Sequence, residues 1–511
     1  MAVGTLPERS RALPLDPESS DVPRLREALS RIGYLSDAVQ QALGARLGPA
    51  HLRKDLPVYL RRLASDQPLH TAIKLFALGQ WIDENAAASA LAPASLHGLV
   101  AAGLLERGPL GLRSTLRLGV HGDLVLAHDR FDPTRGPDLA PDHVLGTNAP
   151  ALLLDGLSVR RPVAATLDLG CGGGVQSFLA ARHSGRVVAV DRNPRALLFL
   201  RLNARLNGVA NVEPLEGDLF APVVGRRFGL LLCNPPYVIS PDSRCVFMDS
   251  GRPHDSMCEE VVRQAPAYLE EGGFATVLCN WALRADEEWS APLRRWVAGN
   301  GCDVWLLRAD QQDPLSYAAV WNRGREAASY AEALDRWLAY YREAGIESIG
   351  MGAILMRRRS GGPHWVRADP LPGEPGEPCH EQILRIFAAE DRLAGLRDDA
   401  PLLAQRFRLV DDHCLEQRLH LERGGYSVEK AEIRLSRGFR FGGTVDPGTL
   451  RLLQRCDGAT PLAVIVDEMV ATGAAERSHL ASTVADTVRK MMALGFLEVS
   501  TDTSEARAAE S

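Results

Sequence analysis

The sequence predicts an α/β protein whose central part is a mostly parallel, doubly wound sheet with helices on both faces. The first observation is a rhythm of short β-rich runs separated by helical spacers, which is typical of strands joined by crossover helices. The second is a glycine-rich turn that directly follows the first run. The runs lie at residues 166–169, 187–190, 230–233, 275–279, 304–307 and 349–356.

Length and composition indicate several domains and exclude some classes of protein. A chain of 511 residues is about three times the size of a common domain, so two or three hydrophobic cores are expected. No apolar run reaches the roughly 20 residues that cross a bilayer. The N-terminus lacks the basic stretch and apolar core of a secretory signal. We therefore expect a cytoplasmic protein with no membrane partner.

Net charge and cysteine content indicate which partners, disulfides and metals to expect. A net charge of -6 argues against a surface built wholly to hold nucleic acid, although it leaves room for a local basic face. Nine cysteines, an odd number without a C-x-x-C pair, indicate reduced and mostly buried thiols. We expect neither a disulfide framework nor a bound metal.

The N-terminal part is expected to be a disordered arm over residues 1–22 and a helical module over 23–130. Helical spacing continues to about residue 104, and alternation at 112–120 and 124–126 around His121-Gly122-Asp123 predicts a β-hairpin. Helices followed by a hairpin are the order of a winged helix. Acidic and basic residues balance over 1–150, so this module is either a nucleic-acid contact or a protein-contact domain.

A Gly/Pro-rich bridge at 360–378 predicts the end of the central domain near Arg359. Beyond it we expect a winged-helix-like α+β accessory domain over residues 379–500 and a disordered polar tail over 501–511. The sequence does not indicate an oligomeric state. The expected elements are strands at 414–421, 428–435 and 496–499 and helices at 447–456, 462–469 and 480–494.

The glycine-rich turn has the sequence T-L-D-L-G-C-G-G-G at residues 166–174. Glycine lets the backbone turn sharply and approach a ligand. The turn lacks the third glycine of a dinucleotide site and the Gly-Lys-Ser/Thr of a phosphate loop. Asp191 follows Asp168 by 23 residues, at the tip of the second strand, where a carboxylate can accept both hydroxyls of a ribose. Together these features predict a nucleoside-type cofactor.

Two later motifs predict the rest of the site. Asp218 and Leu219 follow the expected third strand, where the acid can accept from an adenine amine and the leucine can pack on the ring. N-P-P-Y at residues 234–237 follows the fourth strand. Its prolines lack N–H donors, so the Pro235 carbonyl and the Asn234 side chain can face a substrate beside Tyr237. Such a site suits a planar NH2 group.

This combination resembles the class I S-adenosylmethionine-dependent methyltransferases of the amino-group type, and within them the small-domain group. That group includes release-factor glutamine methyltransferases and enzymes acting on exocyclic amines of adenine or guanine in RNA or DNA. The resemblance covers about residues 143–357 and implies a Rossmann-like, seven-stranded methyltransferase sheet over a domain at 143–359. It also implies S-adenosylmethionine as co-substrate and no metal.

The resemblance implies roles for individual residues. Asn234, Pro235, Pro236 and Tyr237 would hold the substrate amine and carry catalysis. Thr147 would lie near the methionine carboxylate, although a helix-capping threonine is an equally natural interpretation. The sequence departs from the family at Gly229, usually Asp, and in an extra helix at 329–341, which leaves the shape of the cleft open. Cofactor-binding residues would be Thr147, Asp168, Gly170, Cys171, Gly172, Gly174, Asp191, Asp218, Leu219 and Asn234.

Three functions follow from the sequence. The first is an N-methyltransferase acting on a nucleic-acid base, with RNA favoured, by direct in-line transfer that relies on positioning and electrostatics. The second is a methyltransferase for a protein glutamine or a small molecule. The third is a regulatory protein that binds S-adenosylmethionine without turnover.

Overall fold

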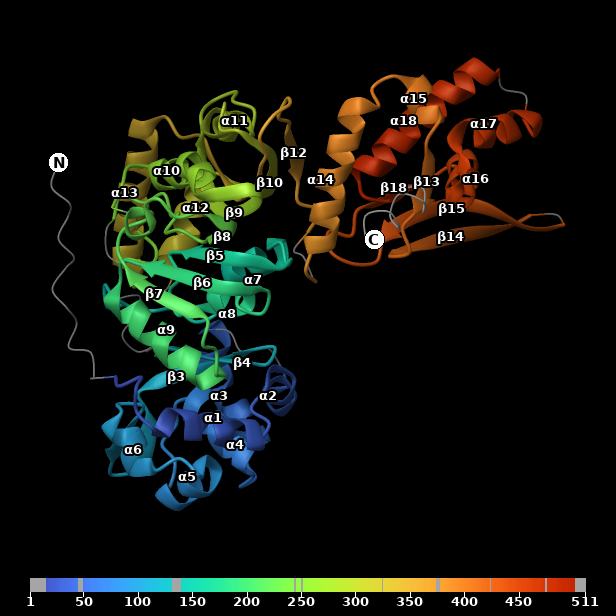
Figure 1. The fold of residues 1–511 in the computed structure, drawn as a ribbon. Coiled ribbons are helices and arrows are strands. Elements are labelled where there is room, and N and C mark those ends of the chain that lie inside the picture. The colour runs from blue at the N-terminus through green and yellow to red at the C-terminus, as the bar shows by residue number, and fades with distance from the viewer. Residues whose placement is uncertain are drawn as a thin grey trace. The chain divides into compact units, whose positions relative to one another are not determined.

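A computed structural model describes residues 15–44, 49–130, 139–242, 245–249, 251–323, 325–373, 377–422, 424–473 and 476–500. Its contacts divide the chain into two compact units, residues 1–155 with 160–370 and residues 156–159 with 371–511 (Figure 1). Most of the expected N-terminal arm and the whole expected tail lie outside the described residues. The first helix, α1, begins at Asp21, within the range expected to be an arm.

The larger unit contains the expected doubly wound sheet, but with eight strands instead of seven. Their order is β12-β10-β11-β9-β8-β5-β6-β7, and β11 alone runs antiparallel to its neighbours. The strands are β5 (Val163–Leu169), β6 (Ser184–Asp191), β7 (Val212–Glu216), β8 (Phe228–Cys233), β9 (Leu269–Leu283), β10 (Cys302–Gln312), β11 (Ser348–Arg358) and β12 (Val366–Pro370). The strand order reverses beside β5, so the ends of β5 and β8 border a crevice of the kind that binds ligands.

The helices of this sheet follow from local signals. For example, α9 starts at Pro194 after Asn193, whose side chain accepts from the Arg195 amide at 3.0 Å, and stops at Gly208 with φ 65°. The helices are α7 (Ala149–Leu157), α8 (Val175–Ala180), α9 (Pro194–Asn207), α10 (Ser256–Gln264), α11 (Ala291–Val297), α12 (Pro314–Asn322) and α13 (Ala327–Ala344), with short 3-10 turns η3 (Ala221–Val223) and η4 (Ala265–Tyr268).

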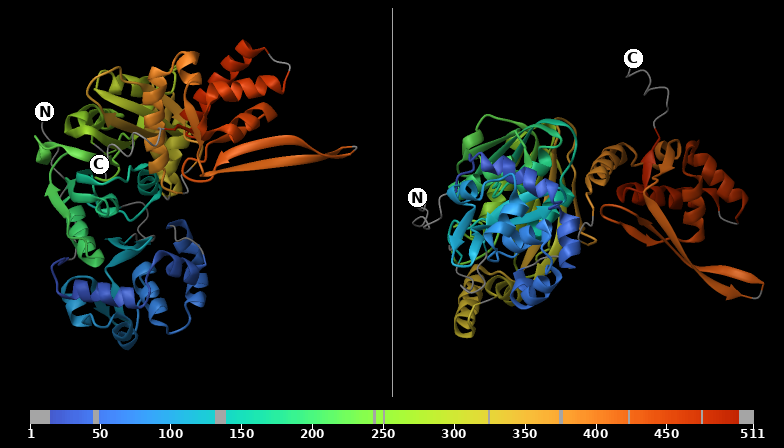
Figure 2. Two further views of the ribbon diagram at one scale, coloured as in Figure 1. Left: turned by 45° about the vertical axis from the view of Figure 1, so that its right-hand side comes forward. Right: turned by 90° about the horizontal axis from the view of Figure 1, so that it is seen from below.

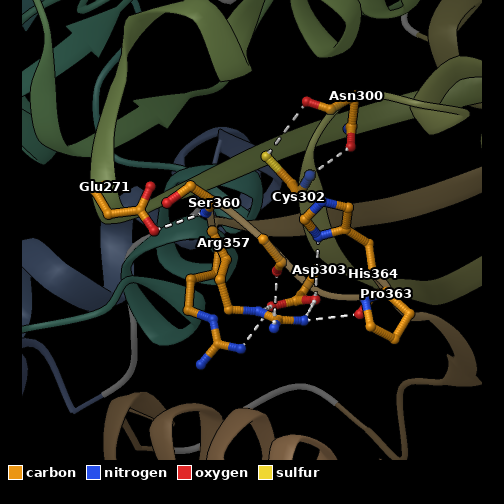
Figure 3. Close-up of polar contacts among 10 residues, drawn as sticks. Glu271, Asn300, Cys302, Asp303, Arg357, Ser360, Pro363 and His364 are labelled. Carbon is orange, nitrogen blue, oxygen red and sulfur yellow. Dashed lines mark hydrogen bonds and ion pairs between the residues drawn. The ribbon is translucent and has the colours of Figure 1, made fainter.

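A buried ion cluster explains the eighth strand, which lies in the stretch expected to be a linker. Asp303, at the start of β10, is fully buried and accepts from Arg359 Nε and Nη2, both at 2.8 Å, and from Arg357 Nη2 at 2.6 Å (Figure 3). Burial opposes ionisation, but these bonds outweigh it and lower the pKa of Asp303 to about 2. The chain after Arg359 therefore stays on the sheet, and β12 pairs in parallel with β10.

The N-terminal module belongs to the same compact unit as the sheet, and its core includes the apolar face of α9. The buried residues Ala196, Phe199, Leu202 and Leu206 of α9 belong to the cluster that contains the module's apolar side chains. The module consists of α1 (Asp21–Arg31), α2 (Ser36–Leu43), α3 (Pro49–Arg62), α4 (Pro68–Ala72), the π-helix η1 (Ile73–Ala77), α5 (Glu84–Leu91), α6 (Leu96–Ala101), β1 (Leu105–Gly108), β2 (Gly111–Ser114), β3 (Leu116–His121) and β4 (Leu124–Asp129).

Two hairpins follow the helices of this module. β3 and β4 form the predicted hairpin, in which His121 pairs with Leu124 across Gly122-Asp123. β1 and β2 form a second one, and Ile82 bridges to Leu112 of β2. The last helical segments before β1 are α4–η1, α5 and α6. The winged-helix character of the module stays a prediction.

The smaller unit contains two three-stranded sheets, in the orders β17-β13-β18 and β14-β15-β16. The expected strands and helices are present, together with several that were not expected. The winged-helix character of this unit also stays a prediction. Its elements are α14 (His380–Gly395), α15 (Asp399–Leu403), β13 (Arg406–Leu409), β14 (His413–Glu422), β15 (Gly425–Leu435), β16 (Gly442–Thr444), α16 (Pro447–Arg455), β17 (Asp457–Pro461), α17 (Leu462–Ala471), α18 (Arg477–Ala493) and β18 (Leu497–Val499).

Candidate functional site

A cavity of about 310 Å³ lies at the carboxyl ends of β5, β6 and β8. Most of the predicted site residues line it together. They are Asp168, Gly170, Cys171, Gly172, Asp191, Asp218, Leu219, Asn234, Pro235, Pro236 and Tyr237. Thr147 and Gly174 are not among the lining residues, although their neighbours are.

The glycines after β5 have different structural reasons. Gly170 and Gly172 have φ of 74° and 53°, and a Cβ at Gly172 would meet nothing within 4 Å. Their open side faces the cavity, where a ligand can approach the backbone. Gly174 has φ 93°, and a Cβ there would lie 2.3 Å from Leu200 and 2.6 Å from Phe178. Gly174 is therefore needed for packing behind the loop.

The Asp191 carboxylate at the tip of β6 is held by backbone amides. Gly172 donates to its Oδ2 and Asn193 to its Oδ1, both at 2.8 Å. Each oxygen has a second lone pair, so the group can accept two further hydrogen bonds. Burial raises the pKa of Asp191 despite these amides. A ribose diol in the cavity would supply two donors to this acceptor.

Asp168 is a buried carboxyl beside Asp191. Ser177 of α8 donates to its Oδ2 at 2.5 Å. Burial raises the pKa of Asp168 to about 7, and the nearby Asp191 contributes to the rise. A cationic ligand would favour the ionised form of such a group.

Asp218 and Leu219, which follow β7 after Gly217, also line the cavity. Leu219 has φ 47°, a left-handed conformation that is uncommon outside glycine and costs energy. The Asp218 carboxylate is half exposed and forms an ion pair with Arg252 at 3.4 Å. A ligand amine at this carboxylate would therefore share it with Arg252.

The N-P-P-Y turn leaves β8 and is held from behind by two tyrosines. The Ile239 amide donates to the Tyr317 hydroxyl at 3.2 Å, and the Tyr341 hydroxyl donates to the Ile239 carbonyl at 2.8 Å. Asn280 of β9 also donates to the Tyr317 hydroxyl, at 2.8 Å. All four residues are buried. The amide and the carbonyl of Ile239, two residues beyond the turn, are thus held by side chains of α12 and α13.

The extra helix expected at 329–341 is α13, and with α12 it lies in the chain between β10 and β11. Trp321 of α12 lines the cavity, as do Phe247 and Met248 from the loop after β8. This part of the cavity lining is therefore aromatic and apolar. Sequence reasoning missed these three residues because no motif or strand end marks them.

Gln176 provides a test of whether the residues fit a charged cofactor. Its Nε2 donates to the Ala151 carbonyl at 2.7 Å, while its buried Oε1 has no hydrogen-bond partner among the described residues. A buried acceptor without a partner is costly, and this side chain lines the cavity. The ammonium group of S-adenosylmethionine could donate to it. Gln176, the glycine cradle and Asp191 therefore fit this co-substrate.

The N-terminal module supports the cavity wall from behind. Asp129, at the end of β4, accepts from the Val144 amide at 2.9 Å and from Arg195 Nε at 2.9 Å. Val144 and the adjacent His143 both line the cavity. The module thereby holds the wall segment against the start of α9.

A second link runs from α9 to β4 and the glycine loop. Asn207 exchanges two hydrogen bonds with the backbone of Val125, at 2.9 and 2.7 Å, and Asn203 does the same with Ala127, at 2.6 and 3.0 Å. The Asn203 amide also donates to the Gly173 carbonyl at 2.9 Å. One side chain therefore joins the module to the loop that borders the cavity.

The comparisons with known proteins agree with this site. Residues 147–296 match the family described as methyltransferase small domain. Residues 31–115 and 387–499 match two families described as domains of unknown function, DUF7059 and DUF7782.

Among the curated relatives, a putative protein N5-glutamine methyltransferase of Methanocaldococcus jannaschii is 32% identical over 119 residues, which are 22% of this chain and 59% of that protein. A ribosomal RNA small subunit methyltransferase C of Alcanivorax borkumensis is 31% identical over 136 residues, 26% of this chain and 38% of that protein. The chain thus spans less than two thirds of either relative. A solved structure, Trm5b from Pyrococcus abyssi, has 17% identity and a TM-score of 0.29, over 48% of this chain and 58% of that one.

The fold, the site and the family match define the class: the central domain is that of a class I S-adenosylmethionine-dependent methyltransferase. Within this class, residues 147–296 match the methyltransferase small domain family.

Other features of the chain concern cysteines, metals and membranes. All nine cysteines are free, and only Cys414 is exposed. Among the described residues, no group of three or more His, Cys, Asp or Glu side chains could hold a metal ion, and no helix is long and apolar enough to cross a membrane.

Proposed function

We propose that this protein transfers a methyl group from S-adenosylmethionine to a planar exocyclic amino group of a nucleic-acid base, most specifically in RNA. The observation that carries the acceptor class is the aromatic wall of the cavity. Tyr237, Phe247 and Trp321 line it together. Unstacked bases bind to such side chains by stacking, whereas a glutamine side chain has no ring to stack.

In this proposal the protein acts mainly by positioning. S-adenosylmethionine supplies the electrophilic methyl group. The Asn234 side chain and the Pro235 carbonyl accept the two hydrogens of the acceptor amine, which aims the nitrogen lone pair at the methyl group. The tyrosine pair behind Ile239 keeps these acceptors in place, and near-attack geometry of this kind lowers the barrier substantially.

Methylation of a protein glutamine is the second candidate. It is favoured by the relative that is described as a putative protein N5-glutamine methyltransferase and by the balance of acidic and basic residues over 1–150. A glutamine amide presents the same planar NH2 group to Asn234 and Pro235.

Transfer of a labelled methyl group from S-adenosylmethionine distinguishes these acceptors. The purified protein is incubated with total RNA or with soluble protein from a strain that lacks the gene. We expect label in RNA, and RNA binding that weakens steeply with salt. Label in protein alone would instead support the glutamine candidate.

Asn234→Ala provides the matched test of chemistry. We expect it still to bind S-adenosylmethionine, while transfer falls by at least about 100-fold because the amine loses an acceptor. Wild-type transfer in this variant would overturn the assignment of the acceptor site. Cofactor binding without transfer to any acceptor in the wild type would favour a regulatory role.

A further inference from the structure

The smaller unit carries a long two-stranded hairpin, here called the β-arm, made of β14 (His413–Glu422) and β15 (Gly425–Leu435). Figures 1 and 2 show it as a ribbon that extends beyond the helices of its own unit. β16 pairs only with residues 432–434 of β15, so the outer half of the β-arm has two strands. A two-stranded ribbon is marginally stable by itself in water.

One face of the β-arm is mostly apolar, and on β14 only His413 and Gln417 are polar positions of this face. At the base, Ile433 and Leu435 of this face are buried. Towards the tip the same face becomes exposed at two cross-strand pairs, Leu419 with Val428 and Leu421 with Tyr426. These four side chains are 52%, 48%, 65% and 73% exposed. Such a cluster of exposed apolar side chains is typical of an interaction site.

The opposite face carries like charges across the two strands, while along β15 Lys430 forms an ion pair with Glu432. Glu416 lies directly across from Glu432, and Arg418 lies across from Lys430. Like charges in directly opposite positions destabilise a hairpin. The face is therefore an acidic row next to a basic row, and it has no net excess of either sign that would favour a nucleic acid.

The outer edge of β14 is unpaired among the described residues, and its positions 414–422 are all exposed. A second copy of the chain fits this edge in an antiparallel register with Gln417 on the two-fold axis. This register places Glu416 opposite Arg418 of the second copy, twice, and Leu415 opposite Leu419. Registers centred on Glu416 or on Arg418 place that charge against itself.

We propose that the β-arm is a dimerisation surface, at which the outer edge of β14 pairs antiparallel with the same edge of a second copy around Gln417. The pairing is isologous, as in most protein dimers. It turns two marginal two-stranded ribbons into one four-stranded sheet with an apolar face. It also aligns the acidic pair Glu416 and Glu432 of each copy with the basic pair Arg418 and Lys430 of the other copy.

The oligomeric state of the full chain tests this proposal by sedimentation equilibrium. We expect a dimer, weakened by about tenfold or more in Glu416→Arg and in Arg418→Glu because each change creates two like-charge pairs. Combining the two changes restores opposite charges and should restore the dimer. Glu429→Arg, at the bulge of β15 away from the edge, is the matched control and should remain dimeric.

The register is tested separately by cross-linking. In the proposed register Cys414, the exposed native cysteine, lies opposite His420 of the second copy. Under mild oxidation, His420→Cys should form a disulfide between chains, because positions 414 and 420 of one strand lie roughly 20 Å apart and cannot bridge. Glu422→Cys should not cross-link.

Two results would overturn the proposal. One is a wild-type chain that is monomeric at all accessible concentrations, which would point to a different macromolecule as the occupant of the β-arm. The other is a dimer that persists in both single charge variants, which would place the interface elsewhere.

Discussion

The carboxylate of Asp191 is oriented by the Gly172 and Asn193 amides, so it faces the cavity without further help from the rest of the molecule. Its sequence position alone predicted this role. The same holds for Gly170 and Gly172, whose backbone angles are those that glycine favours. Gly174 shows the limit of such reasoning, because its reason lies in Leu200 and Phe178, which no loop motif identifies.

Replacing Asp191 by Ala should weaken S-adenosylmethionine binding by roughly 100-fold, since two hydrogen bonds to a charged acceptor are lost. Calorimetry measures the affinity. Glu213→Ala, on the neighbouring strand β7 but outside the cavity lining, is the control and should bind normally. Undiminished affinity in Asp191→Ala would refute the ribose assignment.

Asp168 predicts a dependence of cofactor affinity on pH. Burial and the nearby Asp191 raise its pKa to about 7, so below that value the folded, ligand-free protein holds the proton. A cationic ligand favours the carboxylate, and affinity should therefore rise with pH by up to about tenfold per unit until the pKa is passed. Calorimetry between about pH 5 and 8 measures this slope.

Asp168→Asn is the control for that slope and should flatten it. The same shift affects stability in the opposite direction. Because the folded-state pKa lies above the unfolded value of 3.8, the ligand-free protein loses stability as pH rises from that value to about 7. An affinity in the wild type that does not change with pH would contradict the assignment.

At the scale of elements, the segment α12–α13 completes the acceptor site in a way that the family motifs do not predict. The sequence indicated an extra helix but not what it contacts. Tyr317 and Tyr341 reach the backbone of Ile239 from 78 and 102 residues away. Contacts over such separations depend on how the helices pack, and single-sequence patterns do not contain that information.

Removing the hydroxyl of Tyr341 tests whether this tyrosine supports the N-P-P-Y turn. Tyr341→Phe leaves the Ile239 carbonyl buried without its donor, which costs about 1–3 kcal/mol and loosens the N-P-P-Y turn. We expect kcat to fall by about tenfold with little change in S-adenosylmethionine affinity. Methyl-transfer kinetics and calorimetry measure the two effects.

Tyr330→Phe is a matched control on the same helix, since its hydroxyl makes only a long contact of 3.5 Å with the Ala319 carbonyl. It should keep wild-type kinetics. If Tyr341→Phe lowered the melting temperature but left kcat intact, the tyrosine would be structural and would not position the turn.

At the scale of the whole molecule, the N-terminal module and the sheet form one folded unit. The sequence predicted a separate module, because a change from helical spacing to alternation is visible in the chain. It did not predict that α9 shares a core with this module, or that Asn203 and Asn207 bind β4. The apolar face of α9 predicts that some element packs on it, but it does not specify which one.

Deleting residues 1–130 should therefore destabilise the methyltransferase domain. The deletion exposes the side chains of Phe199, Leu202 and Leu206. The burial of each contributes about 1.5–3 kcal/mol to the free energy of unfolding, and this contribution is lost. The deletion also removes Asp129, which holds the wall residue Val144 and Arg195 of α9. Thermal unfolding and cofactor binding measure the outcome, and a shortened chain that melts and binds like the full one would contradict the shared core.

Asn203→Leu is a milder probe of the same contact. It keeps a side chain of similar size but removes the bonds to Ala127 and Gly173. It should lower the melting temperature and weaken cofactor binding together.

The sequence by itself determined the class of chemistry. The glycine loop, Asp191, Asp218 and N-P-P-Y each follow a strand, and parallel strands bring their carboxyl ends to one edge of the sheet. Local patterns were therefore sufficient to bring these residues together. The tertiary structure decided what supports and encloses them. The tyrosines behind Ile239, the wall at Trp321, the asparagines under β4 and the ion cluster at Asp303 join distant segments whose packing no local pattern specifies.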